Sequence, residues 1–171
     1  MIGDDGYARI TDFGLSKLMG DSSKTNSFCG TPEYLAPEVI AGKEYDYKVD
    51  WWGFGVFLYE LVVGFPAFHN ENRHLLYESI QKEVPIIPGY LSKELQNLLT
   101  ALLEKDPLKR LGNAEEIKAH PWFKTIDWEK MYWKKLEPPF VPFSTSVYDT
   151  RNFDSVMLEC DLVEVYEARR K

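Results

Sequence analysis

The sequence has little that would direct it to an oxidising compartment, a membrane or nucleic acid. Its two cysteines, Cys29 and Cys160, have no metal-binding spacing, and no secretory signal peptide precedes them, so we expect reduced thiols in the cytosol or nucleus. The longest apolar run, residues 49–64, is too short to span a bilayer and carries two acidic residues. Acidic residues outnumber basic ones by 27 to 20, which disfavours a nucleic-acid partner and suits basic peptides.

What the sequence does contain predicts a mainly α-helical fold. With 171 residues and 44% hydrophobic content, the chain can form one packed core. Apolar periodicity predicts helices over about 47–63, 71–82 and 114–119, and a leucine stripe predicts another that begins at the N-cap Ser92. A turn at residues 4–6 predicts a short β-hairpin at the N-terminus, and LEPPFVPF from Leu136 predicts an extended C-terminal tail.

Four motifs occur in an order that is specific in combination. DFG stands at residues 12–14, SFCGTPEYLAPE at 27–38, VDWWG at 49–53 and the pair Lys109-Arg110 further on. In this order and spacing the chain resembles the C-terminal lobe of a serine/threonine protein kinase of the AGC group, which includes protein kinases A, B and C. The resemblance implies a lobe fragment over residues 1–123 and the start of that group's C-terminal extension over 124–171.

The resemblance implies a nucleotide site that uses ATP and Mg²⁺. Asp12 would bind the magnesium ion, for which a hard carboxylate oxygen is suited. Thr11 would line the nucleotide pocket, and Phe153 would lie against the nucleotide. The alternative for Asp12 is an ordinary aspartate that closes a hairpin strand.

The resemblance also implies a site for a basic protein or peptide substrate. Thr31, Pro32 and Leu35 would form the wall that receives the residue after the phosphoacceptor, with Phe28 beside them. Glu60 resembles the carboxylate with which such kinases bind a substrate arginine. A carboxylate placed among Leu, Tyr and Val costs free energy unless it is paired, which argues that it has a function. The alternative for Glu60 is a helix residue that simply reaches the surface.

Ser27 occupies the place of the activation-loop phosphorylation site, where an upstream activating kinase would act. A phosphate there would order the loop by pairing with cations, and Lys17 resembles one such partner. Ser22, Ser23 and Thr25 are interpreted as solvated loop residues. The resemblance gives structural roles to Phe13, Gly14, Lys17, Glu38, Asp50 and Arg110, and it predicts that Glu38 and Arg110 form a buried ion pair.

The printed residues do not include the kinase parts that the family places before DFG. No HRD catalytic loop, glycine-rich loop or phosphate-binding lysine occurs, so the chain alone is expected to be an N-terminally truncated, catalytically incomplete kinase. The alternative is a non-catalytic binding module that acts as a decoy or scaffold. A degenerate relic is disfavoured because the motifs are intact.

Overall fold

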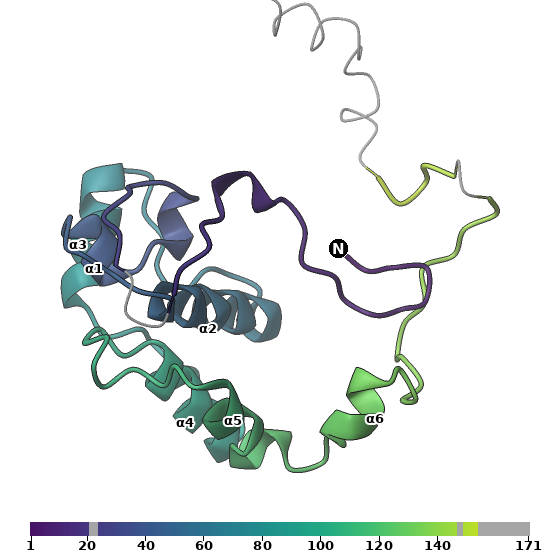
Figure 1. Cartoon of the computed structure of the whole chain (residues 1–171). Helices are drawn as coiled ribbons and strands as arrows, with labels where there is room; N and C mark the ends of the chain where they lie inside the picture. The colour runs from purple at the N-terminus through teal and green to yellow at the C-terminus, as the bar shows by residue number, and fades with distance from the viewer. Residues whose placement is uncertain (21–23, 147–148, 154–171) are drawn as a thin grey trace, which may run out of the picture. The chain divides into compact units, whose positions relative to one another are not determined.

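The structure is a computed structural model that describes residues 1–20, 24–146 and 149–153. It forms two compact units. A tail unit contains Met1–Asp12 and the described residues from Glu129 onward, and a helical unit contains Phe13–Trp128 (Figure 1). The described residues are mostly helical or irregular and form no β-strand. Ser22, Ser23 and Cys160 lie outside the described residues.

The helical unit is organised around one long helix, α2 (Lys48–Val63). It ends at Gly64, whose left-handed φ of 88° lets its N–H bond the Glu60 carbonyl at 2.8 Å. A Cβ atom at position 55 would lie 2.9 Å from that of Leu102, so Gly55 permits α4 to approach closely. The helix is less completely covered than its apolar sequence predicts, because Phe57 and Leu61 are 48% and 65% exposed.

Two further helices complete the core, and the sequence predicts both. Helix α3 (Arg73–Lys82) is capped by the Asn72 side chain, and α4 (Lys93–Leu102) by the Ser92 hydroxyl, which accepts from the Leu95 N–H. This confirms Ser92 as an N-cap. The predicted leucine stripe is also confirmed, since its members are all buried: Leu95, Leu98, Leu99, Leu102 and Leu103.

Short elements connect these helices. The 3-10 helices are η1 (Phe13–Leu15), η2 (Pro32–Tyr34) and η3 (Pro121–Phe123), and the short α-helices are α1 (Pro37–Ile40), α5 (Ala114–Lys118) and α6 (Trp128–Tyr132). Helix α1 packs against α3, and η2 contacts both α2 and α3. Within the part of the chain that the structure describes, no helix has the length and apolar character to cross a membrane.

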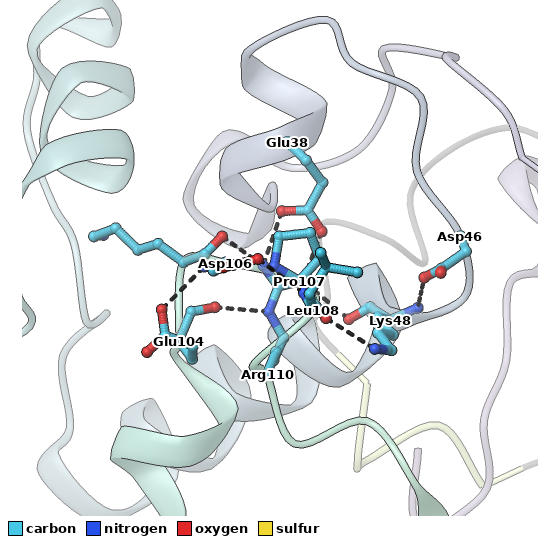
Figure 2. A network of polar contacts seen from close by, with 9 residues as sticks. Glu38, Asp46, Lys48, Glu104, Asp106, Pro107, Leu108 and Arg110 are labelled. Atoms are coloured by element: carbon cyan, nitrogen blue, oxygen red, sulfur yellow. Dashed lines mark hydrogen bonds and ion pairs between the residues drawn. The ribbon is translucent and has the colours of Figure 1, made fainter.

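A buried ion pair joins three parts of the helical unit (Figure 2). The Arg110 guanidinium donates to both Glu38 carboxylate oxygens, at 2.6 and 2.8 Å, and both side chains are at most 5% exposed. Arg110 also donates to the backbone carbonyls of Glu104, Lys48 and Lys105. Arginine has five N–H donors, and these five hydrogen bonds use that number in full. The pair therefore ties α1 to the start of α2 and to the loop after α4.

The tail unit shows less regular structure than the sequence predicts. Residues 4–6 form the expected turn, but the chain on either side of it meets only in an isolated antiparallel bridge between Ile2 and Ala8. The predicted β-hairpin is therefore not shown. Instead the Tyr7 hydroxyl donates to the Leu136 carbonyl at 2.5 Å, and Lys134 forms an ion pair with Asp5. From Leu136 to Ser146 the chain forms no helix or strand, as its prolines predict.

Candidate substrate site and activation loop

The predicted substrate wall is a short segment of the helical unit. Thr31 precedes η2, Pro32 occupies its first position, and Leu35 follows it with only 6% of its surface exposed. Proline suits a first helical position because that position needs no N–H donor. Phe28 lies upstream and is 57% exposed, with its ring edge-to-face against Tyr77 at 6.0 Å. The segment thus presents its polar residues outward and is anchored by Leu35.

Glu60 lines a cavity of about 520 Å³ beside this wall. The cavity's other lining residues come from η2 and from the turn after α2: Glu33, Tyr34, Phe65, Pro66 and His69. The Tyr34 hydroxyl donates to Oε2 of Glu60 at 2.5 Å. The structure thus brings together one predicted site residue, Glu60, and two that sequence reasoning missed, Glu33 and Tyr34. Their only sequence signal is their position inside the motif SFCGTPEYLAPE, which does not indicate a contact between Tyr34 and a residue 26 positions away.

The Tyr34–Glu60 hydrogen bond changes the titration of the tyrosine. The bond to the carboxylate raises the pKa of Tyr34 to about 12 from an ordinary value of 10.0, with desolvation and the negative charge of Glu60 adding to it. A negative phenolate would lose the donated proton and repel the carboxylate. The bond therefore holds Tyr34 neutral and fixes the direction in which Glu60 faces the cavity.

The predicted phosphorylation site, Ser27, is exposed and has a cation nearby. Lys17 Nζ donates to the Thr25 hydroxyl at 3.2 Å, and that hydroxyl lies 3.4 Å from the Ser27 Oγ. The Tyr45 hydroxyl donates to the Ser27 carbonyl at 2.7 Å. All four residues line one cavity of about 480 Å³. Thr25, interpreted from sequence as a solvated residue, in fact lies between the lysine and the serine.

The division of the chain into two units falls within the DFG motif, between Asp12 and Phe13. Asp12 ends the tail unit with a φ of 61°, a left-handed conformation that costs roughly 1 kcal/mol or more for a residue other than glycine. Phe13 begins η1 and is 66% exposed. Phe153 is 50% exposed, and its backbone N–H donates to the Thr150 carbonyl. Thr11, Asp12 and Phe153 thus all belong to the tail unit, whereas the substrate residues belong to the helical unit.

Two further predicted residues lie in helices: Gly14 in η1 and Asp50 in the first turn of α2. The negative charge of Asp50 lies near the positive N-terminal end of the α2 dipole, which is a favourable interaction. Partial desolvation by neighbouring protein raises the pKa of this carboxyl above its ordinary value of 3.8. Asp50 also lines the cavity of about 480 Å³ that Lys17 and Ser27 line.

Comparison with known proteins assigns the family. Residues 1–123 match the protein kinase domain, and the chain belongs to that family. Within it, the relatives are serine/threonine kinases of the AGC group, and the chain is an AGC-type kinase fragment. It is 43% identical over 160 residues to protein kinase C delta type of Rattus norvegicus, covering 92% of this chain and 24% of the relative.

Two other relatives give the same result. The RAC family serine/threonine-protein kinase homolog of Dictyostelium discoideum is 44% identical over 161 residues, which is 93% of this chain and 36% of that protein. The serine/threonine-protein kinase gad8 of Schizosaccharomyces pombe is 48% identical over 153 residues, or 88% and 27% of the two chains. The chain thus spans between about a quarter and about a third of the length of these relatives.

We predict that Tyr34 ionises later than ordinary tyrosines and that Glu60 is the cause. In a pH titration followed by tyrosine ring NMR, Tyr34 should keep its hydroxyl proton until the pH nears 12. The Glu60→Gln variant should lower this pKa by a unit or more. Because the folded pKa exceeds the unfolded value of 10.0, this bond's stabilisation is complete below pH 10 and is lost as the pH rises toward 12.

The matched control is Glu116→Gln, which removes a charge from the exposed surface of α5. An unchanged Tyr34 titration in Glu60→Gln, or an equal change in the Glu116 variant, would contradict the assignment.

Proposed function

We propose that this chain supplies the peptide-binding face of an ATP-dependent serine/threonine protein kinase that phosphorylates basic peptides. The observation that carries the proposal is the cavity at Glu60. Two carboxylates, Glu33 and Glu60, line it together with the aromatic rings of Tyr34 and Phe65. A guanidinium can pair with a carboxylate and stack on an aromatic face at the same time, so this lining suits an arginine side chain.

The hydrogen bonding of Glu60 supports the same proposal. Tyr34 engages Oε2, and among the described residues no group donates to Oε1, which leaves that oxygen for a ligand. The net charge of −7 would attract a cationic peptide to the surface. The wall of Thr31, Pro32 and Leu35 would then receive the residue that follows the phosphoacceptor.

For the nucleotide, the described residues fit only part of the site. Asp12 offers one hard oxygen ligand, and the described part of the chain holds no group of three His, Cys, Asp or Glu side chains that could bind a metal. Mg²⁺ commonly uses one or two carboxylates together with substrate phosphates. Asp12 therefore suits a metal that takes its other ligands from ATP and from protein groups elsewhere; when bound, that ion would neutralise charge on the phosphates.

Exposed apolar side chains favour a part of a kinase over a module adapted to act alone. Phe57 and Leu61 lie one turn apart on α2 and are 48% and 65% exposed. Ile10, in the tail unit, and Phe13, in the helical unit, are 85% and 66% exposed. Two large, exposed apolar side chains on one helix face, such as Phe57 and Leu61, indicate a surface that other protein covers. The second candidate function, a decoy or scaffold, rests on the fact that the Glu60 cavity lies wholly within the helical unit.

Two assignments from the sequence belong to this proposal. Residues 1–123 would be lobe and 124–171 the AGC-type extension, which is supported by a family match that stops at residue 123. Ser27 would be the site at which an upstream activating kinase transfers a phosphate. The proximity of Lys17 and Thr25 supports this, because a phosphate there would find a cation within reach.

We predict that the 171-residue chain binds arginine-containing peptides through Glu60. Binding of a short arginine-rich peptide, measured by NMR titration at low salt, should weaken about tenfold in Glu60→Gln, since a charge-assisted bond contributes about 1.5–3 kcal/mol. Glu116→Gln makes the same charge change on α5, away from the cavity, and should weaken binding less than twofold. Replacing arginine by citrulline in the peptide should abolish the difference. Equal losses in both variants would show general charge attraction and refute the site.

We predict that the 171 residues alone do not transfer phosphate. Their ATP turnover on the same peptide should equal that of Asp12→Asn, because no general base or phosphate-binding lysine of the kinase kind is present. Asparagine is the suitable control since it tolerates the left-handed backbone of position 12. Turnover that disappears in Asp12→Asn would overturn this prediction and would favour a complete active site.

We predict that a phosphate on Ser27 orders the activation loop through Lys17. In the chain carrying phosphoserine at position 27, amide hydrogen exchange over residues 24–30 should slow severalfold relative to the unmodified chain. The Lys17→Gln variant should lose most of this protection. Protection that persists in Lys17→Gln would assign the ordering to another cation, and no protection at all would contradict a role for the phosphate in this loop.

A further inference from the structure

Tyr45, in the segment between α1 and α2, holds the loop that carries Ser27 at two places. Its backbone pairs with that of Thr25 in an antiparallel bridge, with N–H···O=C bonds of 3.0 and 2.8 Å between the N and O atoms. Its side-chain hydroxyl donates to the Ser27 carbonyl at 2.7 Å. Tyr45 therefore fixes the backbone of the loop both at Thr25 and at Ser27.

This backbone arrangement places the side chains of Thr25 and Ser27 next to each other. In extended backbone, successive side chains point to opposite faces, so residues two apart share one face. In agreement, the Oγ atoms of Thr25 and Ser27 are 3.4 Å apart, and Lys17 Nζ donates to the Thr25 hydroxyl at 3.2 Å. A group attached to the Ser27 hydroxyl would therefore start beside Thr25, on the side where Lys17 lies.

The charges around Ser27 are of both signs, so the direction of its side chain matters. Among the described residues that line the cavity of about 480 Å³, Lys17 is the only cation, whereas Asp46 and Asp50 carry carboxylates. The Asp46 carboxylate is held in place, because it accepts from the Lys48 backbone N–H at 2.9 Å. A phosphate on Ser27 would be attracted by Lys17 and repelled by the two aspartates.

The Tyr45 hydroxyl is suited to a fixed role as donor. Desolvation by the surrounding protein raises the pKa of this phenol above its ordinary value of 10.0, so the hydroxyl keeps the proton that it donates. The hydrogen bond to the Ser27 carbonyl is present in the chain without a phosphate, so it does not depend on the modification. Replacement of Tyr45 by Phe would retain the ring and the backbone bridge and would remove only this bond.

We propose that Tyr45 is a positioning residue that directs a phosphate on Ser27 toward Lys17 and away from Asp46 and Asp50. This role rests on the proposed function, in which Ser27 receives a phosphate that pairs with Lys17. It adds that the orientation of the phosphate is set from outside the loop, by a residue 18 positions further along the chain.

The test is a phosphorus NMR titration, at low salt, of the 171-residue chain that carries phosphoserine at position 27. The second pKa of a free phosphoserine is about 6. We expect the phosphate of the parent chain to titrate about half a unit lower, because Lys17 stabilises its dianion. Lys17→Gln should return this pKa to about 6 or above. Tyr45→Phe should cause a similar rise, although Lys17 is still present.

Tyr47→Phe is the matched control. Tyr47 lines the same cavity and is 49% exposed, and the substitution removes the same hydroxyl group from a neighbouring position. It should leave the pKa of the phosphate unchanged. Amide hydrogen exchange of α4 verifies that each variant is folded. In urea the phosphates of the parent chain and of all three variants should titrate alike.

The outcomes separate this role of Tyr45 from the proposed function. A phosphate pKa that rises in Lys17→Gln but not in Tyr45→Phe would overturn the role of Tyr45 and leave the pairing of Ser27 with Lys17 intact. An equal rise in Tyr45→Phe and Tyr47→Phe would also overturn it. No rise in Lys17→Gln would contradict the pairing of the phosphate with Lys17, and the role of Tyr45 with it.

Discussion

The buried ion pair between Glu38 and Arg110 is the interaction on which the helical unit most depends. Burying two charges is costly, and the pair is favourable only because its geometry is bidentate and its other donors are satisfied. The three backbone carbonyls that Arg110 also engages belong to α2 and to the loop after α4. Removal of one partner would leave the other buried and unpaired, at a cost of about 3–5 kcal/mol.

The position of the proposed peptide-binding surface depends on this pair. Glu38 belongs to α1, which directly continues the wall of η2 through Leu35 and Ala36, both almost fully buried. The Tyr34–Glu60 hydrogen bond attaches the same segment to α2 from its other end. The Glu38–Arg110 ion pair and the Tyr34–Glu60 hydrogen bond therefore hold the segment from η2 to α1 against α2. These two side-chain contacts fix the position of a segment that contains only the short helices η2 and α1.

The sequence predicts those parts of the fold that local pattern determines. The leucine stripe and Ser92 define α4, because both periodicity and capping act over a few residues. The ordered motifs likewise identify the family, since their combination is specific. The β-hairpin prediction was less successful: a turn sequence closes residues 4–6, but the flanking residues form one bridge and no strand. A two-stranded hairpin alone is marginal, and its pairing depends on neighbours that local pattern does not reveal.

The contacts that give the sites their chemistry were beyond sequence reasoning. Tyr34 and Glu60 are 26 residues apart and share no periodic pattern, so only the packing of η2 on α2 brings them together. The same holds for Lys105, because the two aromatic rings that its Nζ contacts belong to Trp52 of α2 and to Phe68 in the turn after α2. A lysine in a KDP sequence is ordinarily solvated. Desolvation in the folded chain lowers the pKa of Lys105, and no neighbouring residue in the sequence indicates that burial.

The central claim is that the Glu38–Arg110 pair holds the proposed substrate wall, residues 31–35, in place. Amide hydrogen exchange of residues 31–40 in the Glu38→Gln variant, compared with the parent chain, tests it most directly. The account predicts that protection over 31–40 falls by tenfold or more while the amides of α4 keep most of theirs, because α4 is held by its buried leucines. Unchanged protection over 31–40 would contradict the claim and would show that packing at Leu35 and Ala36 fixes the wall without the ion pair.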